Sequence, residues 1–485
     1  MTVKSLILAV IWTVLFCSFT LAQEQQDQPP DATVEAPKAE PSGPPKTEPS
    51  SGTVSSGDYK FDLSEVKKKP YHVGGFAEFR PVIDGLSSGS AFYKVNFYNQ
   101  PQGGIIQEYN PKTQLDGTLE KGMVRVFTRG NISASNSYQG WSNDTALYEG
   151  YLTLKPSNTW SFDMGKKTFK WGKGYAWNPV AFLDRPKDPT DPDLALEGYW
   201  GASAQYLRSF QSSLKTFSLT AAIIPVFYNV YGNTGLNDSF VGPQLNISGT
   251  HPQPTSNQVN VAAKAYFLFH NTDIELIYFT GQTKTDRYGV DFARNIGPRL
   301  EVHGEFASIM DFQKQVVDTN GNMHSSTYNA LNYLLGLRYV TKKLTTYIFE
   351  YYRNGTGFTS GQMQDYFSYI DKGYNTYITT GNATTIQKAA NLAAGNYGKI
   401  SPMQDYLSLR ISQDQPFGKL YYTPAIGTIV DLDTKSLQLA PELVSTRYKN
   451  WEIRARAYLP VGGKHTEFGE KQNAYRAELR VRWFF

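Results

Sequence analysis

The strongest constraint on the fold is a hydrophobic pattern with a period of two residues, which recurs from about residue 71 to the C-terminus. In 475–485 apolar and aromatic side chains occupy one set of alternate positions, and charged side chains occupy the other. The segments 451–459, 300–306 and 259–267 have the same arrangement. Because successive side chains of a strand point to opposite faces, each segment is predicted to be a strand with one apolar and one polar face.

Less regular segments of the same kind occur along the whole body of the chain. They lie at 73–83, 91–98, 121–130, 147–155, 159–170, 198–208, 214–229, 273–281, 286–293, 328–340, 343–352, 403–412, 418–430 and 434–446. One helix is expected, from about Thr384 to Ala394, inside a long loop at 360–400. Consecutive strands without crossover helices pair antiparallel with their chain neighbours. With strands of roughly ten residues, the chain is predicted to be all-β, with about 16 to 18 up-and-down strands.

Two architectures can use such strands. A soluble sandwich buries its apolar faces against each other, and a chain of this length would then divide into several domains. No linker divides 71–485. A closed transmembrane barrel turns its apolar faces to lipid and its charged faces to a lumen, and it pairs every backbone group. Aromatic residues at the ends of apolar faces, such as Trp451, are typical of the membrane interface. We therefore predict a transmembrane barrel, with a secreted soluble β protein as the alternative.

The N-terminal part of the chain differs from this body. Residues 1–22 combine Lys4, an apolar run and Thr20-Leu21-Ala22, a sequence that a signal peptidase can cleave. This arrangement predicts a cleaved signal peptide. Residues 23–57 are rich in Pro and Glu, and this composition predicts a disordered tether in the periplasm. The barrel is assigned to 58–485. The single cysteine, Cys17, falls in the signal peptide, which excludes disulfides and cysteine-based metal or catalytic sites in the exported chain.

The C-terminal strand carries a resemblance to a known class. Its sequence ELRVRWFF ends in a terminal Phe and resembles the assembly signal of Gram-negative outer-membrane barrels. The residues that carry this signal are Tyr475, Leu479, Val481, Trp483 and Phe485. With the export signal and the strand pattern, 58–485 resembles porin-like outer-membrane proteins. The segment 163–179 (DMGKKTFKWGKGYAWNP) is similar to a strand of alginate-export-like or uncharacterised porin families. The resemblance implies outer-membrane lipid, the barrel assembly machinery and small polar solutes or ions as partners.

The charged face of each strand supplies the candidate pore lining. The basic residues of this set are Lys94, Lys264, Arg338, Arg454, Arg456, Arg476, Arg480 and Arg482, and the acidic residues are Glu78, Glu301, Glu305, Glu452 and Glu478. Arginines concentrate in the last two strands, which predicts a basic wall and a weak preference for anions. The alternative is a ladder of Arg and Glu across the wall that leaves little net field.

The most distinctive loop is 178–193, which contains four prolines between Pro179 and Pro192. Its charged residues are Asp184, Arg185, Asp188, Asp191 and Asp193. Three interpretations are open: a rigid loop folded into the lumen that narrows the pore, a calcium site built from clustered carboxylates, and an ordinary solvated surface loop.

Catalysis has little support in the sequence. The six histidines are scattered, and none is two or four residues from another, so no local metal pair is expected. Residues 85–89 (GLSSG) match the esterase nucleophile motif, but that motif needs a following helix and we expect a hairpin there.

The sequence therefore predicts a porin for passive diffusion, with no enzyme activity, no cofactor, no metal and no nucleic-acid partner. Two alternatives remain: a barrel that sheathes a periplasmic or lumenal protein partner, such as a multihaem electron-transfer cytochrome, and an outer-membrane or secreted enzyme.

Overall fold

The computed structural model describes residues 69–226 and 257–485, so the predicted signal peptide and the tether at 23–57 lie outside the described residues. Within them, 18 strands form one antiparallel sheet in which each strand pairs with its neighbours in the chain. The sheet closes because β1 (Tyr71–Leu86) also pairs with β18 (Asn473–Phe484), with Gly85 opposite Tyr475. The prediction of an up-and-down β-barrel is confirmed.

The strands of the wall follow one another with few interruptions. Between β1 and β18 they are β2 (Ile105–Lys121), β3 (Val124–Ser137), β4 (Gly140–Leu154), β5 (Trp160–Lys167), β6 (Tyr199–Ser209), β7 (Leu214–Val226), β8 (Gln258–Phe269), β9 (Thr272–Gly281), β10 (Arg287–Ile296), β11 (Leu300–Val317), β12 (Met323–Val340), β13 (Thr345–Arg353), β14 (Asp405–Gln413), β15 (Tyr422–Asp431), β16 (Ser436–Ser445) and β17 (Trp451–Val461). The described helices are α2 (Ala91–Phe97), α3 (Ser360–Thr380), α4 (Thr384–Leu392), the π-helical turn η1 (Ala393–Tyr397) and the 3-10 turn η2 (Pro416–Gly418).

The alternating pattern determines which side chains face outward. In β18 the side chains of Leu479 and Trp483 are 42% and 43% exposed, whereas Arg480, between them, is only 4% exposed. In β8 Val259 and Val261 are exposed while Asn260 is fully buried. The outer surface of the barrel is therefore apolar and the interior polar, which is the arrangement of a transmembrane barrel rather than a soluble sandwich.

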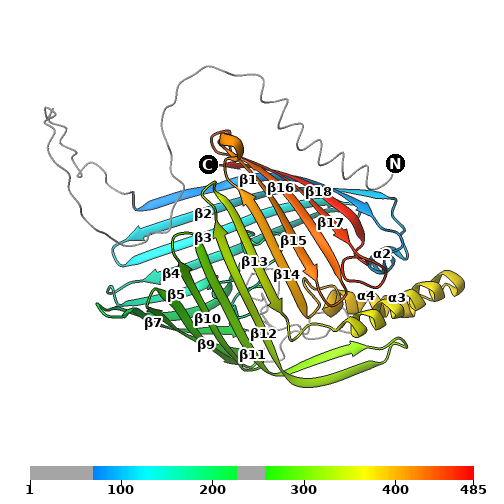
Figure 1. Cartoon of the computed structure of the whole chain (residues 1–485), viewed down its shortest axis with the longest axis horizontal. Helices are drawn as coiled ribbons and strands as arrows, with labels where there is room; N and C mark the ends of the chain where they lie inside the picture. The colour runs from blue at the N-terminus through cyan, green and yellow to red at the C-terminus, as the bar shows by residue number, and fades with distance from the viewer. Residues whose placement is uncertain (1–68, 227–256) are drawn as a thin grey trace, which may run out of the picture. The chain divides into compact units, whose positions relative to one another are not determined.

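The two ends of the barrel differ in the length of their connections. One end, which also contains the start of β1 and the end of β18, has short turns such as 122–123, 270–271 and 297–299. The other end has the long connections 87–104, 168–198, 354–404 and 462–472. We call these the short-turn end and the long-loop end. Figure 1 shows α3 and α4 at the long-loop end and the C-terminus beside β1 at the opposite end.

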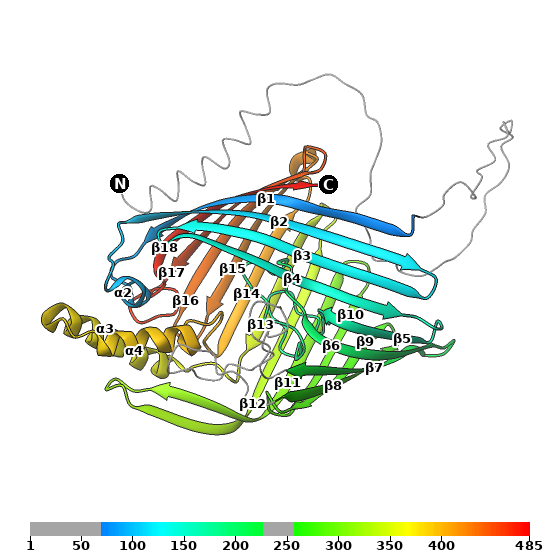
Figure 2. The same cartoon turned by 180° about the vertical axis from the view of Figure 1, so that it is seen from behind.

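The three α-helices pack together at the long-loop end, as both views of the barrel show (Figures 1 and 2). Phe92 of α2 lies edge-on to Phe367 of α3, with ring centroids 6.0 Å apart. Helix α3 begins with a capping box, in which the Thr359 side chain accepts a hydrogen bond from the Gln362 backbone and Gln362 reciprocates. It ends at Gly381, whose φ of +73° is one that glycine adopts without strain. Among the described residues, no helix is long and apolar enough to cross a membrane.

Three local predictions are wrong. The strand predicted at 91–98 is helix α2, so Lys94 is not on the barrel wall. Strand β2 was not predicted as a strand of its own. The segment 360–380, predicted as loop, is helix α3, whereas the helix predicted near Thr384 is present as α4.

Candidate functional site: the lumen and its infolded loop

The wall formed by β17, β18 and β1 carries most of the predicted pore-lining arginines on its inner face. Each of them faces a carboxylate. Arg482 donates to Glu78 of β1 at 2.6 Å, and Arg476 donates to Asp84 of β1 at 3.3 Å. Along β17, the Arg456 Nε donates to Glu442 of β16 at 2.6 Å.

Further contacts extend this row into a network. The Arg454 guanidinium lies 3.5 Å from both Glu442 and Glu452, and Arg480 lies 3.5 Å from Glu478. Because each guanidinium is compensated by a nearby carboxylate, the wall is close to the Arg–Glu ladder that the sequence left as the alternative.

The opposite wall, from β9 to β13, is acidic and holds the connection between β5 and β6. Glu305 of β11 accepts hydrogen bonds from the backbone N–H groups of Lys173 and Gly174 at 2.5 and 2.6 Å, and from that of Val180 at 3.2 Å. Glu350 of β13 accepts from the backbone of Tyr175 and Ala176 at 2.6 and 2.8 Å. Both carboxylates are fully buried. The connection at 168–198 is therefore fixed to the inner wall by its backbone, and we call it the infolded loop.

The glycines of the sequence WGKG within this loop are required by that attachment. Gly172 has a φ of +95°, and a Cβ there would lie 2.8 Å from a Glu305 carboxylate oxygen. At Gly174 a Cβ would lie 2.0 Å from the carbonyl oxygen of Trp177. Residues with side chains would push the backbone away from Glu305, so this motif has a local structural reason.

A third carboxylate fixes the loop to itself. Asp184 accepts hydrogen bonds from the backbone of Phe169 and Trp171 at 2.7 and 3.0 Å. Burial raises the pKa of the Asp184 carboxyl, although these backbone donors work against the shift. Arg185, the next residue, donates to Glu197 at 3.0 Å, so it also acts within the loop rather than toward the lumen.

The tip of the infolded loop crosses to the arginine wall. The Asp191 carboxylate accepts a hydrogen bond from Arg480 at 2.7 Å and lies 3.4 and 3.9 Å from the guanidinium groups of Arg456 and Arg454. Burial would raise the pKa of Asp191, but the arginines outweigh it and hold the pKa below its usual value. Asp191 therefore bears a negative charge between three guanidinium groups.

The other acidic residues of the predicted constriction do not contact the arginine wall with Asp191 but lie in separate settings. Asp188 accepts from the backbone and hydroxyl of Thr190 at 2.8 and 2.6 Å, and Asp193 lines a cavity on the other side of the tip. Among the described residues, no group of three or more His, Cys, Asp or Glu side chains is arranged to hold a metal ion.

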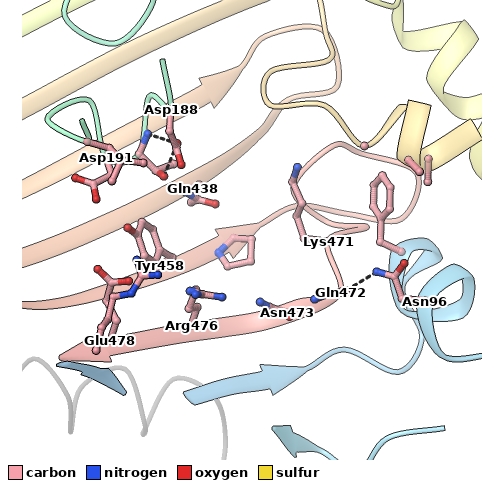
Figure 3. A pocket seen from close by; sticks show the side chains of 18 of the residues that line it. Asn96, Asp188, Asp191, Gln438, Tyr458, Lys471, Gln472, Asn473, Arg476 and Glu478 are labelled. Atoms are coloured by element: carbon pink, nitrogen blue, oxygen red, sulfur yellow. Dashed lines mark hydrogen bonds between the residues drawn. The ribbon is translucent and has the colours of Figure 1, made fainter. Parts of the chain in front are cut away.

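The loop tip separates two cavities in the lumen. The cavity on the long-loop side has a volume of about 580 Å³, and that on the short-turn side about 420 Å³. Thr190 of the loop and Gln438 of β16 line both of them. Figure 3 shows the long-loop cavity, with Asp188 and Asp191 facing Tyr458, Arg476 and Glu478 across it. Thr190 and Gln438 therefore lie between the two cavities.

The remaining predicted pore-lining residues lie in three different settings. Lys264 of β8 lies 3.2 Å from Glu275, and Arg338 of β12 lies 3.8 Å from Glu301 and lines the short-turn cavity. Lys94 belongs to α2 and donates to Asp371 of α3 at 2.5 Å, so its predicted place on a strand is wrong.

Several acidic residues of the interior were missed. They are Asp84, Glu275, Asp291, Glu350 and Glu442, together with the basic residues Arg80 and Arg410. All but Asp84, which directly follows the predicted segment 73–83, lie in predicted strand segments, so the same alternation would have assigned them to the inner face. The attachment of the loop to Glu350, in contrast, has no signal in the sequence.

The esterase-like segment shows no catalytic arrangement. A helix, α2, does follow it, contrary to our expectation of a hairpin, but Ser90 uses its hydroxyl to cap that helix at Tyr93. Among the described residues, the Ser87 side chain makes no hydrogen bond with a histidine or a carboxylate.

A closed antiparallel barrel with an apolar outer surface and a charged interior is the architecture of porin-like outer-membrane proteins, so the predicted resemblance holds for the fold. Searches against protein-family models and curated proteins gave no match. Among solved structures, the chain is similar to OpdQ of Pseudomonas aeruginosa, with a TM-score of 0.48, 11% identity and coverage of 86% of this chain and 99% of that one. It is similar to OccAB3 of Acinetobacter baumannii (0.48, 10%, 86% and 99%) and to a mutant of the Rhodopseudomonas blastica porin (0.39, 10%, 86% and 100%).

Proposed function

We propose that this protein is an outer-membrane channel through which ions or small polar solutes diffuse passively, with a weak preference for anions. The observation that carries the proposal is the infolded loop, which is fixed inside a closed barrel and leaves a polar cavity on each side of its tip. Such a channel selects by size and by charge at a constriction, without turnover or a cofactor.

The orientation follows from the connections. Outer-membrane barrels have short turns on the periplasmic side and longer loops outside the cell. The short-turn end, where β1 begins and β18 ends, would therefore face the periplasm, and α2, α3 and α4 would face the exterior.

The size of the cavities favours a channel over the sheath alternative. Cavities of about 580 and 420 Å³ fit small solutes and are far too small for a folded protein. With the infolded loop in place, a protein partner could contact the rims of the barrel but not fill its lumen.

The weak anion preference is supported by the short-turn cavity. Its lining contains four basic side chains, Lys187, Arg338, Arg410 and Arg456, against three acidic ones, Asp193, Glu350 and Asp414. In the long-loop cavity, Arg80, Lys471 and Arg476 balance Asp188, Asp191 and Glu478. The difference of one charge gives a small bias, and Asp191 reduces it by compensating three arginines at the tip.

The test is the current through the purified protein in a planar bilayer under a salt gradient. The native channel should conduct in steps with a reversal potential slightly on the anion side. Asp191→Asn should raise the permeability ratio for anions by roughly two- to fivefold, because it leaves Arg480 and its neighbours uncompensated. Asp365→Asn removes the same charge from the exposed surface of α3 and should leave the ratio unchanged.

Each outcome has a distinct meaning. A folded, inserted protein that never conducts contradicts the channel. A conducting channel with cation preference that Asp191→Asn does not alter keeps the channel and rejects the assigned role of the arginine wall.

A further inference from the structure

We propose that the cavity on the long-loop side is a binding site for uncharged polyhydroxylated solutes about the size of a mono- or disaccharide. The inference rests on the proposed channel function and specifies what the outer cavity of that channel recognises. Its volume of about 580 Å³ lies within the usual range of small-ligand sites.

Three amide side chains in this cavity have unused hydrogen-bonding groups. Among the described residues, the side chain of Gln438 has no hydrogen-bond partner, and that of Gln472 accepts from Asn96 while its own N–H groups have none. Asn473 donates to Asp84 at 2.8 Å, and its carbonyl oxygen is covered from solvent and has no partner within the described part of the chain. Figure 3 shows Gln438, Gln472 and Asn473 around one space, contributed by β16, the β17–β18 connection and β18.

These groups supply both donors and acceptors at short range. A hydroxyl group both donates and accepts, so a solute with several hydroxyls can accept from the N–H groups of Gln472 and donate to the carbonyl oxygen of Gln438 together. A solute with a single ionic group would leave most of these polar atoms unpaired, which costs binding free energy.

The charges of the cavity do not favour an ion of either sign. The lining contains three basic side chains, Arg80, Lys471 and Arg476, and three acidic ones, Asp188, Asp191 and Glu478. Arg476 is paired with Asp84, and Asp191 with Arg480. Two charged lining residues, Arg80 and Asp188, have no ion pair within the described part of the chain, and their charges are opposite. The electrostatic potential of the cavity therefore contributes little to which solute binds, and hydrogen bonding determines the selectivity.

One side of the cavity is lined by apolar side chains. Phe92 lies there, supported by the ring of Phe367, and beside it the helical turn α4–η1 contributes Ala390, Ala393 and Ala394. Small side chains let a solute approach the helix backbone. A sugar ring has C–H groups on its faces and hydroxyls at its edge, and it can place one face toward this apolar side, where the Lys471 ammonium lies 5.9 Å from the Phe92 ring centroid, while its edge meets the amides.

The experiment measures block of the single-channel current by added solutes. Maltose is the neutral polyhydroxylated probe, glycine betaine the zwitterion without hydroxyls, and acetate the simple anion. We expect concentration-dependent, saturable current interruptions with maltose and none with betaine or acetate. Gln438→Ala and Gln472→Ala should each weaken the block roughly three- to tenfold, as for the loss of one or two hydrogen bonds. Gln387→Ala, on the exposed face of α4, should have no effect.

The results separate this inference from the channel proposal. A protein without conductance rejects the channel itself. A conducting channel that maltose does not block, or that betaine or acetate blocks as strongly as maltose, rejects the polyhydroxylated class. Block that Gln438→Ala and Gln472→Ala leave unchanged places the sugar elsewhere and rejects this cavity.

Discussion

Glu305 and Glu350 hold the backbone of the infolded loop, so these two carboxylates keep the loop inside the pore. Together they accept hydrogen bonds from five backbone N–H groups between Lys173 and Val180. Glu350 also contacts the buried His303 Nε2 at 2.9 Å, which fixes the orientation of its carboxylate. Charge-assisted hydrogen bonds of this kind are stronger than neutral ones, so two carboxylates can fix a long loop inside the barrel.

Neutralising these carboxylates should therefore release the loop. We expect Glu305→Gln, Glu350→Gln and especially the double variant to weaken the attachment by about 1.5–3 kcal/mol for each site. The expected readout is a larger and noisier single-channel conductance. Asp365→Asn, which removes one negative charge from the exposed surface of α3, is the control. Unchanged conductance in the double variant would show that the loop does not depend on these residues.

For individual residues, the sequence predicts the strand face on which a side chain lies better than the group that the side chain contacts. Alternation places Arg454, Arg480 and Glu305 on one face of their strands, and these side chains are at most 11% exposed. It did not predict that Glu305 would bind loop backbone, or that Asp191 would meet Arg480, because those contacts join residues more than one hundred positions apart. They depend on strand register and loop path, which a pattern with a period of two does not contain.

Among the structural elements, the two errors in strand assignment have physical causes. In α2 the buried residues Ala91, Tyr93, Val95 and Phe97 alternate along the chain, although they form two helical stripes of residues four apart. A segment of seven residues is too short for the two periods to be told apart, and the Ser90 cap was the available sign of a helix. Strand β2 was missed because its polar residues and Pro111 obscure the pattern.

The connection between β17 and β18 should respond to pH through Glu467. This side chain is buried, accepts the Tyr406 hydroxyl at 2.6 Å, and has its pKa raised by burial to about 7. Because the fold favours the protonated form, its contribution to stability is complete below the ordinary carboxyl pKa and is lost as pH rises through about 7. Hydrogen exchange, corrected for intrinsic rates, should show weaker protection of 462–472 at pH 8 than at pH 5. The free energy of opening should fall by about 1 kcal/mol for each pH unit between the ordinary carboxyl pKa and about pH 7.

A variant separates this effect from general base sensitivity. Glu467→Gln keeps an acceptor for Tyr406 without a charge and should retain protection at pH 8, whereas the exposed Asp365→Asn should follow the native protein. Equal loss of protection in the native protein and in Glu467→Gln would assign the pH dependence to another group.

For the whole molecule, a period of two and the absence of crossover helices were sufficient to predict a closed antiparallel barrel, because few architectures place one apolar face outward along the entire chain. The long-loop end was the least predictable part. Helix α3 has few aliphatic residues, and its core is aromatic: Tyr366 and Tyr397 stack with ring centroids 4.0 Å apart, and Phe358 stacks on Tyr397 at 4.2 Å. Those contacts arise from tertiary packing rather than from helical periodicity.

Closure of the barrel depends on the last residues of the chain. Phe485 and Gly75 exchange two backbone hydrogen bonds of 3.1 Å, and Phe484 pairs with Phe76 in β1. Deleting 483–485 would leave Gly75, Phe76 and Ala77 of β1 without partners on the β18 side, although β2 still pairs with their other side. Each backbone group left unsatisfied where the barrel faces lipid costs several kcal/mol. We expect the truncated chain to lose the heat-modifiable, membrane-inserted form on gels. Trp483→Ala and Phe485→Ala, which keep every backbone pair, distinguish strand closure from recognition of the terminal side chains. If both variants insert and the truncated chain does not, backbone closure is the requirement. Normal insertion of the truncated chain would contradict the role assigned to this strand end.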